Sequence, residues 1–397
     1  MNLVISNKNR YSIAIICKVV SILTTFLASI FINRALGVSL KGDYAYVLRI
    51  VDMLYIACGI GLGQTYTIYK RRSKNNAKSV FSSLIIIHAI IISILGTTVT
   101  MVFDIEYGYA IFLITACSVL HNNFSMIAVI EDSIKRNILV TFLNLFYLAT
   151  LAIIYSLNLS NLNIMLFIYG LNELIIAVVT MFVFKIYPGL IMNAREDIAE
   201  IYKNGFLTMI VMFLISVNYS IDVVMLKHFS SSYYVGLYSV AVTFSNMFLV
   251  IPDALKELMF GNATKNSFKS DVNKSFGISF VVSFFILIGF ALFGKFFIGL
   301  LYGNDYLPSY MLTLVIFIGC LSMIFFKILH PVYIAFEKQL RLSIILSISA
   351  ITNIGLNMFL IRIYNDLGAS IATAISYTVC GIIILIDYRR MLHSKMI

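Results

Sequence analysis

The stretch Ser82–Ile94, with the sequence SSLIIIHAIIISI, is a continuous apolar run and decides the fold class of this chain. It lacks the alternation of apolar and polar residues that a membrane β-barrel strand shows over about ten residues. A segment in lipid must have its backbone hydrogen bonds satisfied, and a helix achieves this within one segment. The run therefore predicts a membrane-spanning α-helix.

The composition extends this prediction to the whole chain. Of its 397 residues, 60% are hydrophobic and only 12% are charged, whereas a soluble domain carries about 25% charged residues. Soluble enzymes and nucleic-acid-binding proteins are excluded, so the formal charge of +11 indicates no nucleic-acid partner. We expect an all-α integral membrane protein. Twelve apolar runs of spanning length lie near residues 11–33, 44–68, 79–103, 107–130, 138–157, 164–186, 205–227, 234–258, 277–301, 309–335, 342–363 and 368–387.

The basic residues alternate between the two ends of these runs. Of the 29 Lys and Arg residues, 21 fall on the same side as the N-terminus, four on the opposite side and four inside runs. Because Lys and Arg are enriched in cytoplasmic loops, both termini are predicted to be cytoplasmic. The first run has no convincing small-residue cleavage site and is expected to stay as a signal anchor.

An internal repeat divides the chain. A Gly-x-Tyr pattern opens the second run at Gly42–Tyr44 and the eighth run at Gly236–Tyr238, with an offset of 194 residues. Six spans in each half are an even number, so both halves enter the membrane from the same side and the repeat is parallel. We expect two six-helix bundles related by a pseudo-two-fold axis, the first over residues 1–190 and the second over 191–397.

The connections between the runs are short, which disfavours a membrane enzyme with a large outer catalytic loop. The sequence has no glycine-rich phosphate loop, no His/Cys metal cluster and no nucleophile elbow. We therefore predict no catalytic residues, no cofactor and no metal site, and interpret His88 and His121 as packed helix residues. Transport is the function that such a chain supports most simply.

Polar residues follow one face of the first run. Lys18 is followed at helical spacing by Ser21, Thr25 and Ser29. A lone lysine could extend its ammonium group to the membrane interface, but the row of hydroxyl groups favours the wall of a water-filled cavity. We interpret these four residues as cavity-lining.

Two further in-span groups each fit two interpretations. Arg49 and Asp52 lie three residues apart, so they either form a self-neutralising ion pair or provide an anion-binding arginine that Asp52 tunes. Glu173 lies near the middle of the sixth run, where a carboxylate either couples transport to a proton or cation, or is a buried structural acid.

The second half has its own polar positions. Asn218 and Asp222 share one helical face near the outer end of the seventh run, and we expect them to line the cavity. Lys327 lies toward the cytoplasmic side of the tenth run, and Lys295 lies near the outer end of the ninth. Four in-span cations against three acids leave a slightly basic interior, which suits an anionic cargo.

Several stretches form an ordered pattern along the whole chain. They are Asn33–Gly37 with Gly42–Tyr44, Gly59–Gln64, Leu300–Tyr306, Asn353–Asn357 and Gly368–Thr373. This pattern resembles the O-antigen (Wzx-type) polysaccharide-repeat flippases of the multidrug/oligosaccharidyl-lipid/polysaccharide (MOP) exporter superfamily, whose fold is MATE-like. Asn365 stands where that family commonly has glycine, and Arg362 lies near the usual position of a proline.

The resemblance implies a function in the bacterial cytoplasmic membrane. Such proteins move an undecaprenyl-diphosphate-linked oligosaccharide, an O-antigen or capsule repeat unit, to the outer leaflet by alternating access. It also implies a polysaccharide polymerase and a chain-length regulator as partners, and antiport with H⁺ or Na⁺. We expect Lys18, Arg49 and Lys327, with Asp52, to contact the diphosphate headgroup, and Glu173 to couple the ion.

Two alternatives stay open. The first is an ion-coupled multidrug exporter of the same superfamily, whose cavity should favour carboxylates over cations. The second is a polytopic membrane enzyme of surface-polysaccharide synthesis, against which the short outer connections argue.

Overall fold

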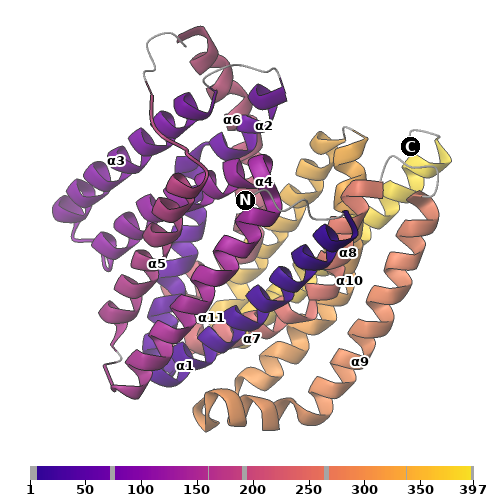
Figure 1. The fold of residues 1–397 in the computed structure, drawn as a ribbon. Coiled ribbons are helices and arrows are strands. Elements are labelled where there is room, and N and C mark those ends of the chain that lie inside the picture. The colour runs from indigo at the N-terminus through magenta and orange to yellow at the C-terminus, as the bar shows by residue number, and fades with distance from the viewer. Residues whose placement is uncertain are drawn as a thin grey trace. The chain divides into compact units, whose positions relative to one another are not determined.

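The computed structural model describes residues 7–71, 77–159, 161–189, 195–262, 268–336 and 338–394. Within these ranges the regular structure consists of helices, without a strand, which confirms the all-α prediction (Figure 1). The elements are α1 (Asn7–Gly59), α2 (Leu62–Arg71), α3 (Ala77–Phe103), α4 (Gly108–Ser156), α5 (Leu162–Val183), α6 (Arg195–Phe229), α7 (Ser232–Phe248), α8 (Val250–Asn262), α9 (Phe268–Tyr302), the 3-10 helix η2 (Asn304–Tyr306), α10 (Ser309–Ala335) and α11 (Gln339–His393).

The three longest helices are each broken once. α1, α4 and α11 contain 53, 49 and 55 residues, and at 1.5 Å per residue each would be more than about 70 Å long if straight. A bilayer core is only about 30 Å thick, so each must cross it twice. The backbone leaves the helical conformation at Gly37 in α1, Asp132 in α4 and Asn365 in α11.

Two of these breaks have a left-handed backbone. Gly37 has φ +66° and Asn365 has φ +50°. Glycine enters this region without steric cost, and asparagine tolerates it better than most residues do. Asn365 therefore adopts the positive φ angle for which the resembled family commonly has glycine.

The broken helices account for the predicted number of spans. In the part of the chain that the structure describes, eight helices are long and apolar enough to cross a membrane, or nine with the bent pair α7–α8. Division of α1, α4 and α11 at their breaks then yields the twelve predicted runs. The pair α7–α8 bends by 45° just before Pro252, which lies in the first turn of α8, where its missing N–H removes no helical hydrogen bond.

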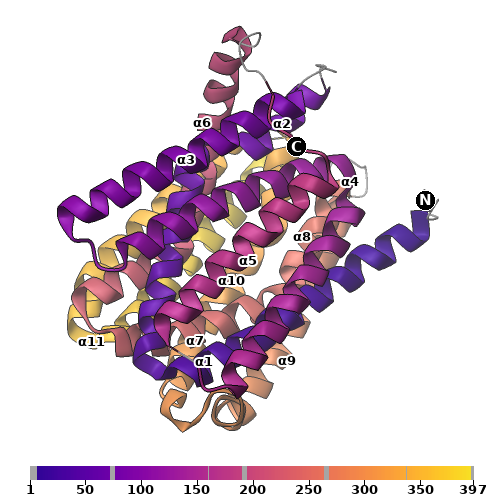
Figure 2. The same cartoon turned by 60° about the vertical axis from the view of Figure 1, so that its left-hand side comes forward.

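The contacts between residues divide the chain into two compact units. Unit 1 comprises Met1–Leu36 and Val47–Phe213, and unit 2 comprises Gly37–Tyr46 and Leu214–Ile397. In unit 1, α4 packs between α3 and α5 (Figure 2). In unit 2, α10 packs against α7, α8, α9 and α11 (Figure 1). The boundary near residue 190, which the repeat suggested, stays a prediction.

The two glycines of the repeat motif lie against each other's segments inside unit 2. A Cβ atom added at Gly42 would be 1.8 Å from the carbonyl oxygen of Ser232 and 3.0 Å from the backbone nitrogen of Gly236. A Cβ added at Gly236 would be 2.0 Å from the carbonyl oxygen of Val38. Glycine is therefore required at both positions because the two backbones touch there. Each glycine of the sequence repeat therefore packs against the segment that carries the other glycine.

Candidate functional site

Arg49 and Asp52 form an ion pair on the second part of α1. The Nη1 atom of Arg49 lies 3.1 Å from Oδ2 of Asp52, and the two side chains are 29% and 36% exposed. Residues three apart on a helix share one face, so the continuous helix here produces the pair directly. Asp52 holds the guanidinium group in place, and the Arg49 side chain as a whole is partly exposed.

A second ionisable pair joins α4 to α5. Nδ1 of His121 lies 2.9 Å from Oε2 of Glu173, and both side chains are largely buried. The sequence analysis interpreted His121 as a packing residue and overlooked this contact, because a partner 52 residues away leaves no local spacing signal. Glu173 therefore has a hydrogen-bonding partner near the middle of its helix.

The two pairs belong to one polar cluster inside unit 1. The charges of Asp52 and Glu173 interact with each other. Tyr55 and Tyr169 interact with both carboxylates. We call this group of six side chains the N-terminal polar cluster: Arg49, Asp52, Tyr55, His121, Tyr169 and Glu173. Among the described residues, no group of three or more His, Cys, Asp or Glu side chains is arranged to hold a metal ion.

The residues of the predicted polar face of the first span do not share one environment. Ser21 pairs with Thr141 of α4 across 3.1 Å, whereas Thr25 is exposed and bonds to the carbonyl of its own helix. Ser29 likewise bonds within α1. The side chain of Lys18 lies outside the described residues. The role of these residues as cavity lining stays a prediction.

Asn218 and Asp222 on α6 are both buried and bonded to neighbouring helices. The amide of Asn218 donates to the carbonyl of Leu346, 3.1 Å away in α11. Asp222 accepts hydrogen bonds from Tyr238 of α7 and Thr373 of α11, the second at 3.0 Å. These contacts join three helices of unit 2, which is a packing role that the prediction of a cavity wall did not include.

Lys327 lies in an ionic group that the sequence analysis missed in part. Its Nζ atom is 3.0 Å from Oδ1 of Asp253, and the Nζ atom of Lys256 is also 3.0 Å from that oxygen. The Lys327 ammonium also lies 5.3 Å from the centre of the Tyr219 ring. Asp253 and Lys256 lie three residues apart within one predicted run, so the spacing that identified Arg49 and Asp52 could have identified them as well.

A buried ion pair in unit 2 joins the first repeat motif to the segment that precedes the second. Lys227, at the end of α6, donates to Asp43, which also accepts from the hydroxyl of Ser232. The side chains of Lys227 and Asp43 are only 17% and 12% exposed. The sequence analysis assigned no individual role to Lys227 or Asp43.

The chain has the fold of the MurJ and MATE structures that it matches, which confirms the expected MATE-like architecture. A structure described as the lipid II flippase MurJ in an inward closed conformation matches 96% of this chain and 88% of its own, with TM-score 0.72 and 11% identity. An inward-facing multidrug resistance MATE transporter of the MOP superfamily matches 95% of both chains, with TM-score 0.71 and 14% identity.

A further neighbour is the MATE transporter VcmN of Vibrio cholerae, in mutant form. It matches 98% of this chain and 97% of its own, with TM-score 0.61 and 13% identity. No protein-family model and no curated protein sequence matches this chain. The similarity therefore lies in the fold.

Proposed function

We propose that this chain is a flippase that moves an undecaprenyl-diphosphate-linked oligosaccharide, an O-antigen or capsule repeat unit, across the bacterial cytoplasmic membrane. The observation that carries the proposal is the ion pair of Arg49 with Asp52 in a predicted span, with the Arg49 side chain 29% exposed. A guanidinium has five N–H donors in a planar fork that matches phosphate oxygens. Asp52 keeps the empty site neutral, and the diphosphate replaces it as the partner.

The fold supports a lipid-linked cargo. The neighbour with TM-score 0.72 is described as a lipid II flippase. In our proposal the diphosphate lies among the cations while the lipid tail stays in the bilayer. The product reaches the outer leaflet, where a polymerase with its chain-length regulator consumes it.

Three further ionisable residues have roles in this proposal. Lys18 extends the headgroup site along the first span. Lys327 shares Asp253 with Lys256, so this group carries one excess positive charge and offers a second anion contact. Glu173, paired with His121, is the group that we propose to exchange H⁺ or Na⁺ in antiport with the cargo.

A multidrug exporter is the second candidate function. It is favoured by the MATE neighbours and by the two carboxylates, Asp52 and Glu173, within the N-terminal polar cluster. A cationic drug would use these carboxylates and would be repelled by Arg49. The two functions therefore predict opposite effects of removing the Arg49 charge.

Reconstituted transport distinguishes them. Proteoliposomes containing a lipid-linked oligosaccharide with a fluorescent glycan report translocation, and a cationic dye reports drug export. We expect Arg49→Gln to slow oligosaccharide translocation at least about ten-fold, because loss of a charge-assisted contact costs about 1.5–3 kcal/mol. Lys295→Gln is the matched control, since Lys295 is an exposed cation on α9 whose ammonium lies 5.4 Å from the Tyr310 ring centre.

Two results would contradict the proposal. One is equal oligosaccharide translocation by Arg49→Gln and the unmodified chain at matched protein content. The other is dye export that rises in Arg49→Gln while oligosaccharide is never translocated, which would favour the multidrug exporter.

A further inference from the structure

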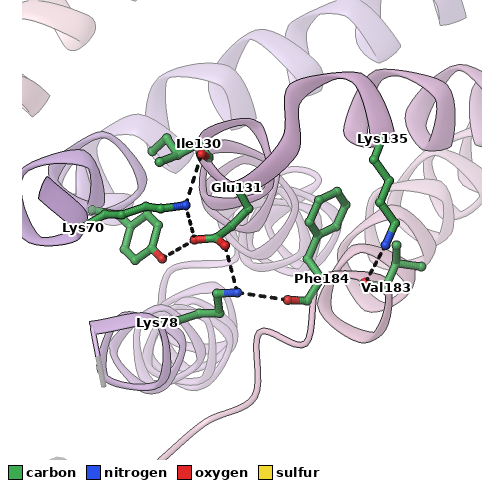
Figure 3. A network of polar contacts seen from close by, with 8 residues as sticks. Lys70, Lys78, Ile130, Glu131, Lys135, Val183 and Phe184 are labelled. Atoms are coloured by element: carbon green, nitrogen blue, oxygen red, sulfur yellow. Dashed lines mark hydrogen bonds and ion pairs between the residues drawn. The ribbon is translucent and has the colours of Figure 1, made fainter. Parts of the chain in front are cut away.

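One end of unit 1 carries a network of lysines around a single carboxylate (Figure 3). Oε1 of Glu131 accepts a hydrogen bond from Lys70 at 2.9 Å, and its Oε2 lies 3.3 Å from the Nζ atom of Lys78. Tyr66 donates to the same carboxylate at 2.6 Å. Glu131 therefore ties α2 and α3 to the end of the first part of α4.

Lys78 and a further lysine, Lys135, reach the end of α5. Lys78 donates to the carbonyl of Phe184 at 3.3 Å, and Lys135 donates to the carbonyl of Val183 at 3.3 Å (Figure 3). The Lys135 ammonium also lies 5.2 Å from the centre of the Phe184 ring. Cations at the last carbonyls of a helix are stabilised by its dipole. Three helix ends thus share one basic surface.

This surface keeps an excess of positive charge. Four lysines lie on it or beside it in sequence, namely Lys70, Lys78, Lys135 and Lys185, against the two carboxylates of Glu131 and Asp132. Asp132 is engaged with backbone, since its Oδ1 accepts from the nitrogens of Ile134 and Lys135. The side chains of Lys70 and Lys78 are 40% and 31% exposed, and Lys135 is exposed. An anion can therefore reach these ammonium groups.

An apolar pocket lies below this surface between the same three helices. Its volume is about 370 Å³, and its walls come from α3, α4 and α5. Its lining residues nearest to the basic surface are Ile86, Phe124 and Met181, one on each helix. Ile86 is eight residues from Lys78, which is about 12 Å along the helix. Phe124 is seven residues from Glu131, or about 10 Å, and Met181 is three residues from Phe184, or about 5 Å.

Part of the pocket wall is exposed in the part of the chain that the structure describes. Ile90 and Ile94 of α3, Leu113 of α4 and Val178 of α5 line it and are at least 38% exposed. A surface of this kind inside a bilayer is in contact with hydrocarbon chains. Since half a bilayer core is about 15 Å thick, one lipid could reach from the basic surface into the pocket.

We propose that this end of unit 1 is a binding site for an anionic phospholipid, with the phosphate at Lys78 and Lys135 and an acyl chain in the α3–α4–α5 pocket. The occupant follows from charge complementarity, because a zwitterionic lipid gains little from an excess of lysines. Juxtamembrane lysines attract anionic lipids by about 1 kcal/mol each. The bound lipid would hold the ends of α3, α4 and α5 together in the leaflet on that side.

The absence of tryptophan from the sequence permits a direct test. Val178→Trp places a single fluorophore in the pocket wall, and Phe285→Trp on α9, at an exposed position, is its control. The full chain is reconstituted in vesicles of phosphatidylcholine with a minor fraction of acyl-brominated lipid, either phosphatidylglycerol or phosphatidylcholine. Bromine quenches tryptophan only on contact, so the ratio of the two quenching levels measures headgroup preference at that position.

We expect the pocket tryptophan to be quenched more strongly by brominated phosphatidylglycerol, and the control tryptophan to be quenched equally by both. Lys78→Gln and Lys135→Gln should each lower the preference about five-fold. Lys274→Gln, which removes an exposed lysine from α9, should leave it unchanged. Equal quenching of the pocket tryptophan by both lipids, or a preference that survives in the double Lys→Gln variant, would overturn the proposal.

A second measurement covers the case in which the lysine variants do not fold. Raising the salt concentration with the lysines intact screens the attraction of exposed charges. The preference at the pocket tryptophan should then fall, and Lys78→Arg with Lys135→Arg should retain it at low salt. A preference that is independent of salt would equally overturn the proposal.

Discussion

At the scale of single residues, charges inside the spans meet partners either on the same helix or on another helix. Asp52 pairs with Arg49 one helical turn away, and such a pair can be predicted from spacing alone. Glu173 pairs with His121, and Lys327 with Asp253. These contacts depend on which faces of two helices meet, and no pattern within either segment specifies that.

Glu173 is where ion coupling can be tested. Glu173→Gln keeps the shape and a hydrogen-bonding partner for His121 but removes the exchangeable charge. If Glu173 carries the ion, translocation by this variant should become slower and insensitive to collapse of the proton or sodium gradient. Asp52→Asn is the comparison, since Asp52 also interacts with Glu173 but pairs with Arg49. A Glu173→Gln variant that responds to the gradient like the unmodified chain would exclude this role.

The buried pair of Asp43 and Lys227 should matter for stability. Asp43→Asn removes the charge that faces Lys227, whose side chain is only 17% exposed. Removal of one member of a buried pair costs about 3–5 kcal/mol. We expect a lower unfolding temperature in detergent. The exposed Asp305→Asn should change stability by less than about 0.5 kcal/mol.

A double variant separates the pair from its parts. Asp43→Asn combined with Lys227→Met removes both charges and should recover part of the loss. Lys227→Met alone completes the cycle. If the double variant loses as much stability as the two single variants together, the two side chains are not energetically coupled.

At the scale of elements, the close approaches of helices rely on residues that lack a side chain. Gly42 and Gly236 permit backbone contact where the two repeat motifs meet. The Gly-x-Tyr spacing was visible in the sequence, but it was interpreted only as a sign of duplication. That the two glycines pack against each other's segments depends on the folding of Gly37–Tyr46 with unit 2.

Alanine at either glycine tests this contact. A Cβ at Gly42 or Gly236 would lie 1.8 or 2.0 Å from a carbonyl oxygen, so Gly42→Ala and Gly236→Ala should each destabilise the protein by about 1–3 kcal/mol. Gly277→Ala and Gly355→Ala are matched helical controls with nothing within 4 Å of the added Cβ. They should be neutral or stabilising, because alanine is the better helix former. The unfolding temperatures of the four variants are measured under one condition. Equal unfolding temperatures for the contact variants and the controls would contradict the backbone contact.

At the scale of the whole molecule, the distribution of charge predicts the direction of insertion. With 21 of 29 basic residues on one side, both termini should face the cytoplasm. A fluorescent protein that matures only in the cytoplasm should be bright when fused after Ile397, and alkaline phosphatase at the same place should be inactive. Fusions after Asn158, in a connection predicted to lie outside, should give the reverse. Phosphatase activity at Ile397 would disprove the orientation.

The sequence by itself determined the helical membrane class and predicted twelve spans with the charges that lie in them. Each segment's own hydrophobicity and length decide whether it can span a bilayer, so these features can be predicted segment by segment. Only the tertiary structure decided which charges on different helices meet. It paired His121 with Glu173 and Lys227 with Asp43, and it gathered Lys70 and Lys78 on Glu131. These contacts arise when helix faces pack, and packing depends on the shapes of side chains far apart in the chain.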